Sequence, residues 1–281
     1  MHVGVGLPNT TPGADRELLI NWARQADEGP FSNLSVLDRL VYDSYEPLTV
    51  LAAAAVITQR IRLATTIVIS PLRNTALLAK EAATVDVLSG GRLTLGLAVG
   101  ARRDDYDAAG VEYASRGKRL TEQLEALRAY WEDESFGPRP IQPNGPELLI
   151  GGGSDHTFAR MVRYADGYVH GGGPPKTFAR AAEKARSAWL DAGRPGQPRL
   201  WAMGYFALGG DAAETGHAYL RDYYAFTGPF AEKIAAGLLT TPQAIAQFIR
   251  GYADAGCDEL VLFPTVPALE QLQRLAEVIG H

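Results

Sequence analysis

DVLSGGRLTLGLAVGARRDDY, residues 86–106, is the stretch that decides the fold. A segment of helical composition runs into Ser89-Gly90-Gly91, where glycine supplies the left-handed conformation that ends a helix. A nearly unbroken apolar run from Leu93 to Val99 follows, which indicates a strand buried on both faces. Four charged residues come directly after it, at 102–105. They predict the rim of a pocket at the carboxyl end of that strand.

The same alternation extends along the whole chain. Apolar or β-branched runs predict eight strands, at residues 2–7, 34–38, 61–69, 92–99, 147–151, 167–170, 199–208 and 258–263. Between them, apolar residues recur at spacings of three and four, as at Leu120, Leu124 and Leu127, which is typical of helices packed on a sheet. No Pro/Gly/Ser linker interrupts the series. The pattern predicts an α/β fold, a single (β/α)8 TIM barrel domain over residues 1–281.

The composition excludes several classes of protein. The chain has 281 residues, of which 46% are hydrophobic, and a formal net charge of −5 with no block of like charges. This balance gives no support to a nucleic-acid or membrane-surface partner. Cys257 is the only cysteine, which excludes an internal disulfide and favours a cytoplasmic location. No signal-peptide pattern opens the sequence and no apolar run approaches a membrane span, so we expect neither export nor membrane insertion.

Three common chemistries find no matching motif. Residues 4–9 (GVGLPN) lack the third glycine of a dinucleotide-binding turn. The five histidines form no His-x-His pair, so we expect no metal site. No lysine stands at the end of a predicted strand, where a Schiff-base enzyme would need one.

Two glycine-rich turns follow consecutive strands. In LLIGGGSDHTFARM, residues 148–161, a strand is followed by Gly151, Gly152, Gly153 and Ser154 and then by a helix. Bare N–H groups at a helix N-terminus suit a phosphate, although a tight turn capped by Ser154 or Asp155 explains the pattern equally well. Because Gly171 and Gly172 follow the next strand, the pair of turns favours a phosphorylated ligand close to the main chain.

Polar residues at other strand ends are candidates for the chemistry, each with a structural alternative. Asp38-Arg39 closes the second strand, where a salt-bridged barrel end is at least as good an explanation as catalysis. His170 ends the sixth strand, as a hydrogen-bonded wall residue or as an acid–base group. Arg102 and its neighbour Arg103 suit either a solvated rim or an anion site. Thr65, Thr66 and Ile67 lie in a β-branched run that fits the barrel core.

The residues resemble those of a known family, the bacterial luciferase-like flavin-dependent monooxygenases with their deazaflavin-using relatives. The likeness covers most of the chain and rests on three stretches, VGVGLP from residue 3, SVLDRLVYDSYEPLTVL onward to residue 100, and LLIGGGSDHTFARMVRYADGYV from residue 148. The resemblance implies a (β/α)8 barrel that holds a flavin at the carboxyl end of the strands.

The resemblance also implies places for the cofactor. A non-proline cis peptide in the family's third strand lies against the flavin ring, and Thr65-Thr66-Ile67 occupies that position, with Thr66–Ile67 the expected bond. Gly100 would flank the ring, and Gly152, Gly153 and Ser154 would lie near the ribityl phosphate. Gly151, Gly171 and Gly172 complete the expected cofactor contacts.

Three positions depart from the family pattern. Many relatives have a histidine that transfers protons where this chain has Arg39. Some deazaflavin-dependent dehydrogenases have a glutamate where this chain has Ala101, which argues against that reaction. Luciferase has a phosphate-binding arginine where this chain has Val99, a role that Arg102 or Arg103 would have to take over.

The resemblance therefore implies an enzyme, a monooxygenase that uses reduced FMN and oxygen on a small organic substrate. Arg39, His170 and Arg102 are the expected catalytic residues, and a separate reductase is the expected source of reduced FMN. A deazaflavin (coenzyme F-420) dependent oxidoreductase that transfers hydride is the alternative, and a flavin-binding protein without turnover is a second one. The identity of the substrate stays open, and a homodimer is expected because family members often dimerise.

Overall fold

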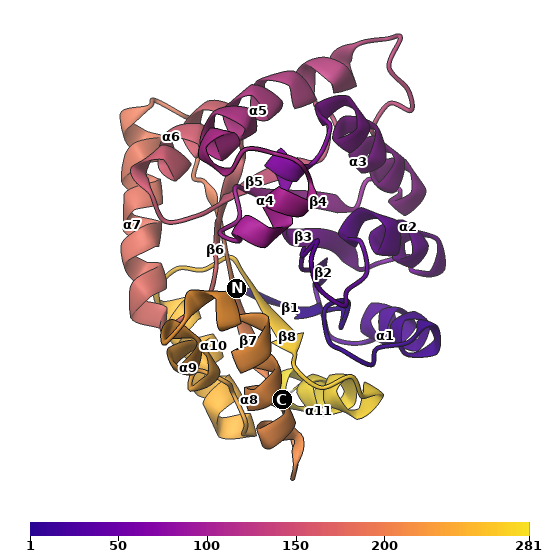
Figure 1. The fold of residues 1–281 in the computed structure, drawn as a ribbon, viewed down its shortest axis with the longest axis vertical. Helices are drawn as coiled ribbons and strands as arrows, with labels where there is room; N and C mark the ends of the chain where they lie inside the picture. Colours follow the sequence, from indigo (N-terminus) through magenta and orange to yellow (C-terminus); the bar gives the residue numbers. More distant parts are fainter. Residues whose placement is uncertain (281) are drawn as a thin grey trace.

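The computed structural model describes residues 1–280. Neighbouring strands are all parallel, and the last pairs with the first, which closes the barrel in sequence order. The predicted (β/α)8 barrel is confirmed (Figure 1). The strands are β1 His2–Gly6, β2 Asn33–Val36, β3 Arg62–Ile69, β4 Leu93–Ala98, β5 Glu147–Gly151, β6 Gly167–His170, β7 Arg199–Phe206 and β8 Glu259–Pro264.

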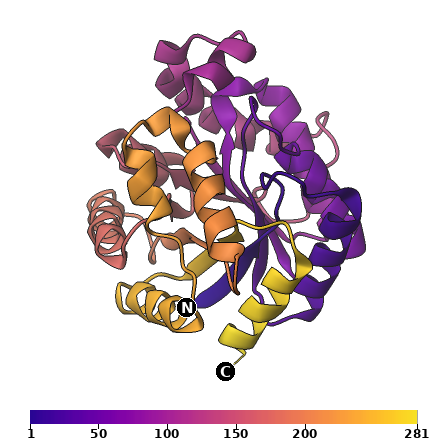
Figure 2. The same ribbon diagram turned by 60° about the horizontal axis from the view of Figure 1, so that its bottom comes forward.

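Helices surround the strands, as Figures 1 and 2 show. They are α1 Arg16–Glu28, α2 Pro47–Ile57, α3 Thr75–Ser89, α4 Arg103–Ala108, α5 Arg116–Glu132, α6 Asp155–Tyr164, α7 Pro175–Asp191, α8 Ala212–Tyr223, α9 Phe230–Ala235, α10 Pro242–Asp254 and α11 Leu269–Ile279, with the short 3-10 helices η1 Ser70–Leu72, η2 Tyr113–Ser115 and η3 Ala225–Thr227. No helix within residues 1–280 has the length and apolar content needed to cross a membrane.

The opening stretch folds as its pattern predicts. Helix α3 ends at Gly90, whose φ of 69° is left-handed and whose N–H bonds back to the carbonyls of Asp86 and Val87. Every residue of β4 is buried. Burial on both faces explains the continuous apolar run, because the inner face fills the barrel and the outer face meets the helices.

Two strands, β2 and β7, end two residues earlier than predicted because the residues that follow find other partners. Leu37 leaves β2 because its N–H and C=O bond to the side chain of Asn9, at 3.1 and 2.8 Å. After β7, the N–H of Ala207 bonds to the carbonyl of Leu239, and that of Leu208 to the Gln271 side chain. The apolar sequence continues through Leu37, Ala207 and Leu208, but the hydrogen bonding between neighbouring strands does not.

One chain excursion covers part of the barrel's carboxyl end. Residues 207–238, here called the roof, leave β7 after Phe206 and return at Leu239, which forms a parallel bridge with Phe206. The roof contains α8, η3 and α9 and is the orange segment in Figure 2. Its residues Tyr219, Tyr223 and Leu238 share one buried apolar cluster with Leu37, just after β2, and with barrel side chains from β7 and β8.

The opposite, amino-terminal end of the barrel contains a buried carboxyl group. Glu259 is 2% exposed and accepts hydrogen bonds from the side chains of Ser32 and Asn33. Burial raises the pKa of Glu259, although these two hydrogen bonds act to lower it. A carboxyl whose pKa is raised on folding stabilises the protein below its unfolded pKa, and this contribution is lost as the pH rises through the folded value.

We therefore expect Glu259→Gln to raise the melting temperature at pH 7.5 by about 3 °C, with a gain that shrinks toward pH 4. Glutamine keeps an oxygen that accepts from Ser32 and Asn33 but carries no charge. Differential scanning calorimetry at several pH values measures the difference. Glu147→Gln is the matched control, since Glu147 is partly exposed and pairs with Arg62 and Arg199, and it should show no pH-dependent gain. Equal behaviour of the two variants would contradict the assignment.

Candidate functional site

The predicted site residues come from five consecutive strands, and the closed parallel barrel brings them to one end. Arg39 follows β2, Thr65, Thr66 and Ile67 lie in β3, and Gly100 and Arg102 follow β4. Gly151 ends β5, His170 ends β6, and the glycine turns lie just beyond these two strands. Since β2 and β6 are four strands apart in a ring of eight, Arg39 and His170 stand on opposite sides of the barrel mouth.

Strand β3 has the expected irregularity. The Thr66–Ile67 peptide is cis, as predicted, and the pairing with β4 shifts between Thr65 and Val68. The Thr65 hydroxyl donates to the Gly96 carbonyl at 2.8 Å and accepts from the Gly96 N–H at 2.9 Å. Thr65 is therefore fully engaged within the barrel. Thr66 is 4% exposed, and its hydroxyl has no hydrogen-bond partner within residues 1–280.

Two of the glycines are explained by packing around β3. A Cβ on Gly151 would lie 3.1 Å from Ile67, and a Cβ on Gly96, which the sequence analysis did not single out, would lie 2.2 Å from the Thr65 carbonyl oxygen. Gly100 has a φ of 65°, and a Cβ there would lie 2.8 Å from Ile69. Gly96 and Gly100 need glycine for their own backbone geometry, independent of any ligand, whereas Gly151 is only closely packed against the Ile67 side chain.

The turn after β5 leaves helix α6 with free N–H groups. Ser154 occupies the N-cap position, but no side chain caps the helix. The Ser154 hydroxyl instead contacts the Thr157 hydroxyl at 3.3 Å, and the Asp155 carboxylate pairs with Lys184 on the exposed surface. The sequence allowed either a phosphate site or a turn capped by Ser154 or Asp155, and the described residues show no such side-chain cap. The N–H of Thr157 bonds to the Ser154 carbonyl at 2.9 Å, so the N–H groups of Asp155 and His156 are the first-turn donors available to an anion.

His170 lies in the wall of the mouth. Its Nδ1 contacts the Tyr168 hydroxyl at 3.1 Å, and its Nε2 contacts the Thr177 hydroxyl at 3.2 Å. Burial lowers the pKa of His170, although a hydrogen bond with the Gly172 backbone acts to raise it. The ring is therefore neutral near pH 7 and has a partner at each nitrogen, which is the wall-residue alternative of the sequence analysis.

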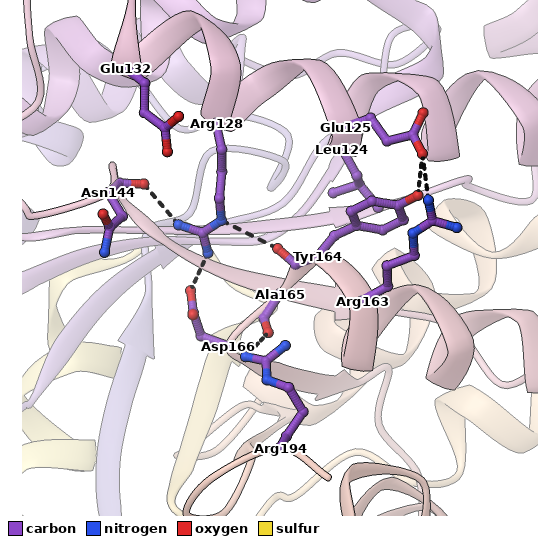
Figure 3. Close-up of a pocket in the computed structure, with 10 residues that line it drawn as sticks. All are labelled: Leu124, Glu125, Arg128, Glu132, Asn144, Arg163, Tyr164, Ala165, Asp166 and Arg194. Atoms are coloured by element: carbon purple, nitrogen blue, oxygen red, sulfur yellow. Dashed lines mark hydrogen bonds and ion pairs between the residues drawn. The ribbon is translucent and has the colours of Figure 1, made fainter. Parts of the chain in front are cut away.

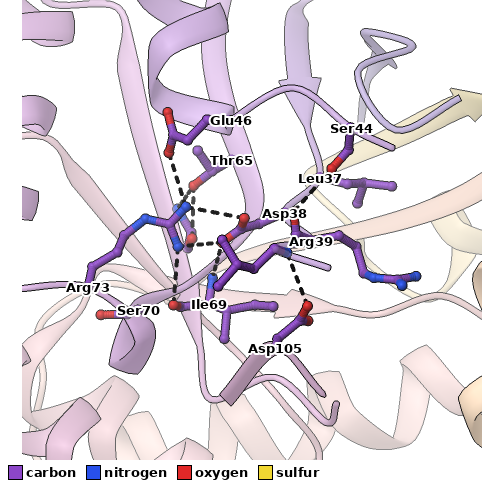
Figure 4. Close-up of polar contacts among 12 residues, drawn as sticks. Leu37, Asp38, Arg39, Ser44, Glu46, Thr65, Ile69, Ser70, Arg73 and Asp105 are labelled. Carbon is purple, nitrogen blue, oxygen red and sulfur yellow. Dashed lines mark hydrogen bonds and ion pairs between the residues drawn. The ribbon is translucent and has the colours of Figure 1, made fainter. Parts of the chain in front are cut away.

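Asp38 and Arg39 are adjacent in sequence but their side chains contact different residues (Figure 4). Asp38 accepts from the Ile69 N–H at 2.8 Å and from Arg73 at 2.6 and 3.2 Å, and Arg73 also pairs with Glu46. Asp38 thus forms the salt-bridged barrel end. The Arg39 guanidinium points away from this ion pair. Arg73 was missed because the SPLRN segment had no visible partner in the sequence.

Arg39 is buried, at 7% exposure, without a carboxylate in salt-bridge contact among the described residues. Its Nη1 donates to the Tyr223 carbonyl and its Nη2 to the Val41 carbonyl, both at 2.9 Å. The guanidinium carbon lies 4.3 Å from the ring centre of Tyr42 and 4.8 Å from that of Tyr223. Burial, and after it the charge of Arg102, lowers the pKa of Arg39.

Arg102 lies near Arg39 but is neutralised locally. It pairs with Asp104 and, at 3.6 Å, with Asp105, and it lies over the ring of Phe226 in the roof. Asp105 is fully buried and accepts from the backbone N–H groups of Leu40 and Val41 at 3.1 and 2.7 Å. Asp105 therefore ties the loop after β2 to the loop after β4. The sequence shows Asp104 and Asp105 as adjacent acidic residues, but it does not show that the N–H groups of Leu40 and Val41 donate to Asp105.

Unpartnered polar atoms gather in this region. Within the described residues, seven buried side-chain nitrogen or oxygen atoms have no hydrogen-bond partner. Two of them are Arg39 Nε, after β2, and Thr66 Oγ1, in β3, whereas Arg102 Nε and Asp105 Oδ2 form the 3.6 Å ion pair with each other. Buried polar atoms are normally paired, so the unpartnered atoms of Arg39 and Thr66 indicate a place where a ligand supplies the partners.

A cavity away from this region lies at the other end of the barrel. It has a volume of about 450 Å³ and is lined by α5 and by the loops before β6 and β7, at the amino-terminal end of the barrel (Figure 3). Its cations already have partners, since Arg128 binds the Asn144 carbonyl and Asp166, and Arg163 pairs with Glu125. This cavity shows the features of a structural ion-pair network rather than those of the predicted site.

The fold is a (β/α)8 barrel, and polar groups without protein partners lie at the carboxyl ends of its strands. Barrel enzymes have their active sites at this end. Residues 1–259 match the family model described as luciferase-like monooxygenase. The chain belongs to this family, whose members and structural neighbours are oxidoreductases, and the resemblance stated from the sequence is confirmed.

Relatives and solved structures agree with this assignment. An uncharacterized protein of Mycobacterium tuberculosis is 32% identical over 196 residues, which cover 64% of this chain and 68% of that protein. An F420-dependent secondary alcohol dehydrogenase in complex with an F420-acetone adduct has a TM-score of 0.79, at 16% identity over 99% of this chain and 98% of its own. The oxygenating constituent of 3,6-diketocamphane monooxygenase of Pseudomonas putida, in complex with FMN, has a TM-score of 0.74, at 16% identity over 99% and 97%. At these identities the two structures show the shared fold.

Proposed function

We propose that this chain is a flavin-dependent monooxygenase that uses reduced FMN and oxygen to oxidise a small organic substrate. The proposed cofactor region is the β3–β6 side of the mouth, where the Thr66 hydroxyl lacks a partner and the first turn of α6 is uncapped. A Cβ on Gly153 or Gly171 would meet no atom within 4 Å, so the main chain there is open to a ligand. These features fit a phosphorylated flavin or deazaflavin.

Each side chain has a proposed task around that cofactor. Gly152, Gly153 and Ser154 would present main-chain N–H groups to the phosphate, with Gly171 and Gly172 beside them. Thr66 Oγ1, next to the cis Thr66–Ile67 peptide, would bond to a polar atom of the ring. The bound flavin supplies the reaction with oxygen. Arg102 and His170 would orient the substrate, and the packed barrel interior would exclude water.

The observation that carries the choice of reaction is that the carboxylates on the β2 side of the mouth are already engaged, Asp38 by Arg73 and the Ile69 N–H and Asp105 by the N–H groups of Leu40 and Val41. Arg39 occupies the position at which the family resemblance implies a histidine in many relatives, and an arginine remains charged at any physiological pH. Burial raises the pKa of Tyr205 and of Tyr223 well above the ordinary value, so both stay protonated. Hydride abstraction from an alcohol needs a base beside the substrate. Oxygen transfer from a flavin depends less on a base beside the substrate than hydride transfer does.

Cofactor titration tests this proposal. Purified protein is titrated with FMN and with the deazaflavin F420, and reduced FMN is then mixed with air-saturated buffer and a panel of ketones, aldehydes and aromatic compounds under labelled oxygen. We expect tighter binding of FMN and transfer of label into one class of compound. Tighter F420 binding would support hydride transfer instead. FMN binding without any effect on its reoxidation would support the non-catalytic alternative. A separate flavin reductase, as the source of reduced FMN, is part of the proposal.

We also propose that the protein is a homodimer in solution. Helix α2 contains no charged residue, although it lies on the outside of the barrel beside α3. Val56 in α2 is 63% exposed, and Leu77 and Leu88 in α3 are 54% and 46% exposed. Apolar faces of this kind are typical of protein interfaces.

We expect Val56→Asp to weaken the dimer at least ~100-fold, because a charge would be buried in the interface without a partner. Light scattering after size exclusion at micromolar concentration measures the mass. Leu190→Asp is the matched control, since Leu190 is 78% exposed on α7, away from α2 and α3, and this variant should remain dimeric. A monomeric wild-type protein would contradict the assignment.

A further inference from the structure

The roof leaves and returns to the barrel at one strand. Ala207 donates to the Leu239 carbonyl and Leu239 to the Tyr205 carbonyl, each at 3.0 Å, so both ends of the roof are held at β7. The part farthest from β7 needs separate contacts if it is to stay over the mouth. Those contacts come from residues 219–224, at the end of α8 and just after it.

Four side-chain contacts hold this part of the roof. The Tyr219 hydroxyl bonds with the Thr10 hydroxyl at 2.9 Å, and the Tyr224 hydroxyl with that of Tyr205 at 2.7 Å. Tyr42 donates to the Asp222 carboxylate at 2.7 Å, and Arg39 donates to the Tyr223 carbonyl at 2.9 Å. Two of the four come from the loop after β2, which is three strands from β7 in the ring.

Arg39 is the central contact of this group. Besides its bond to the roof, it donates to the Val41 carbonyl in its own loop. Its guanidinium lies against the ring of Tyr42, which contacts the roof at Asp222, and against the ring of Tyr223 in the roof itself. The Tyr42 and Tyr223 rings also meet edge to face, 5.2 Å apart. A charged donor between two aromatic rings makes stronger contacts than a neutral one.

We propose that Arg39 is a positioning residue that holds the roof closed over the β7–β2 side of the mouth, and that release of its contacts with Tyr223 opens this side to ligands. Arg39 bridges the loop after β2 and the roof. The closed roof buries Tyr205 and packs against Phe263, so the space in which a substrate would meet the cofactor is controlled by Arg39. The control of substrate access by Arg39 rests on the proposed function, whereas the closure of the roof by Arg39 does not.

Hydrogen–deuterium exchange of the ligand-free protein tests the closure. We expect Arg39→Met to speed exchange of the amides of residues 219–227 at least about tenfold, since a charged hydrogen bond and two ring contacts are lost. Exchange in α5 should stay unchanged. Arg39→Lys keeps a charged donor and should restore part of the protection. Tyr223→Phe keeps both the carbonyl and the ring, and is the matched control that should match the wild type.

A second measurement reports on access to the site. With FMN bound, quenching of its fluorescence by the neutral probe acrylamide should increase about threefold or more in Arg39→Met and remain at the wild-type level in Tyr223→Phe. Failure of FMN to bind would contradict the proposed function and leave the exchange result to decide the closure. Unchanged protection of residues 219–227 in Arg39→Met would overturn the inference, and so would an equal loss of protection throughout the barrel in both Arg39 variants.

Discussion

Replacing Gly153 by valine is expected to lower the affinity for FMN about 100-fold without lowering the melting temperature. A Cβ at this position meets no protein atom within 4 Å and the backbone φ is not left-handed, so the folded protein accommodates the side chain. A phosphate at the first turn of α6 would compete with it for the same space. Loss of two charged hydrogen bonds of about 1.5 kcal/mol each corresponds to roughly this factor. Fluorescence titration with FMN measures it.

The control measurements separate the phosphate from the ring. Riboflavin, which lacks the phosphate, should bind the wild type and Gly153→Val with similar affinity. Gly137→Val introduces the same side chain at another open position, in the loop after α5, and should leave FMN binding unchanged. Equal FMN affinity of Gly153→Val and wild type would show that the phosphate does not lie at this turn.

Replacing Asp86 by alanine is expected to destabilise the protein by about 3 kcal/mol and to lower the melting temperature by about 8 °C. Asp86 is fully buried, and its carboxylate accepts from the N–H groups of Ile141 and Gln142 and from the Gln142 side chain, at 2.6 to 3.1 Å. Alanine would leave all three donors without this acceptor. Urea unfolding followed by circular dichroism measures the difference.

Asp133→Ala is the matched control for this prediction. The Asp133 carboxylate also accepts two hydrogen bonds, from the N–H and the hydroxyl of Ser135, but it lies on the surface, where water replaces them. Its stability should equal that of the wild type within error. Similar losses in both variants would mean that the burial of Asp86 contributes nothing.

The barrel was predictable because its signal is local and repeated. Each strand is a short apolar run and each helix has its own period, so the eight units could be recognised one at a time. The roof was not predicted as a unit, because α8 and α9 contain several exposed polar residues and two of the buried residues of α8 are tyrosines. The ends of β2 and β7 were placed too far along, because Asn9 and Leu239, the groups that end them, are distant in sequence.

The site shows the same division. Thr66–Ile67 was located through the family pattern, and the glycine turns through their composition. The partners of Arg39 and Asp105 were not found, because Tyr223, Leu40 and Val41 contribute backbone groups, and every residue type has those.

The amino-acid sequence by itself determined the closed parallel barrel, the family, and the end of the barrel at which polar groups gather, since these depend on hydrophobic period and on the order of residues along the chain. Only the tertiary structure decided which of those groups already have partners. Arg39 was a catalytic candidate in the sequence, and in the fold it lies between Tyr42 and Tyr223, bonded to a carbonyl 184 positions away. The physical reason is that hydrogen bonds and burial depend on distances in space, which a linear pattern does not contain.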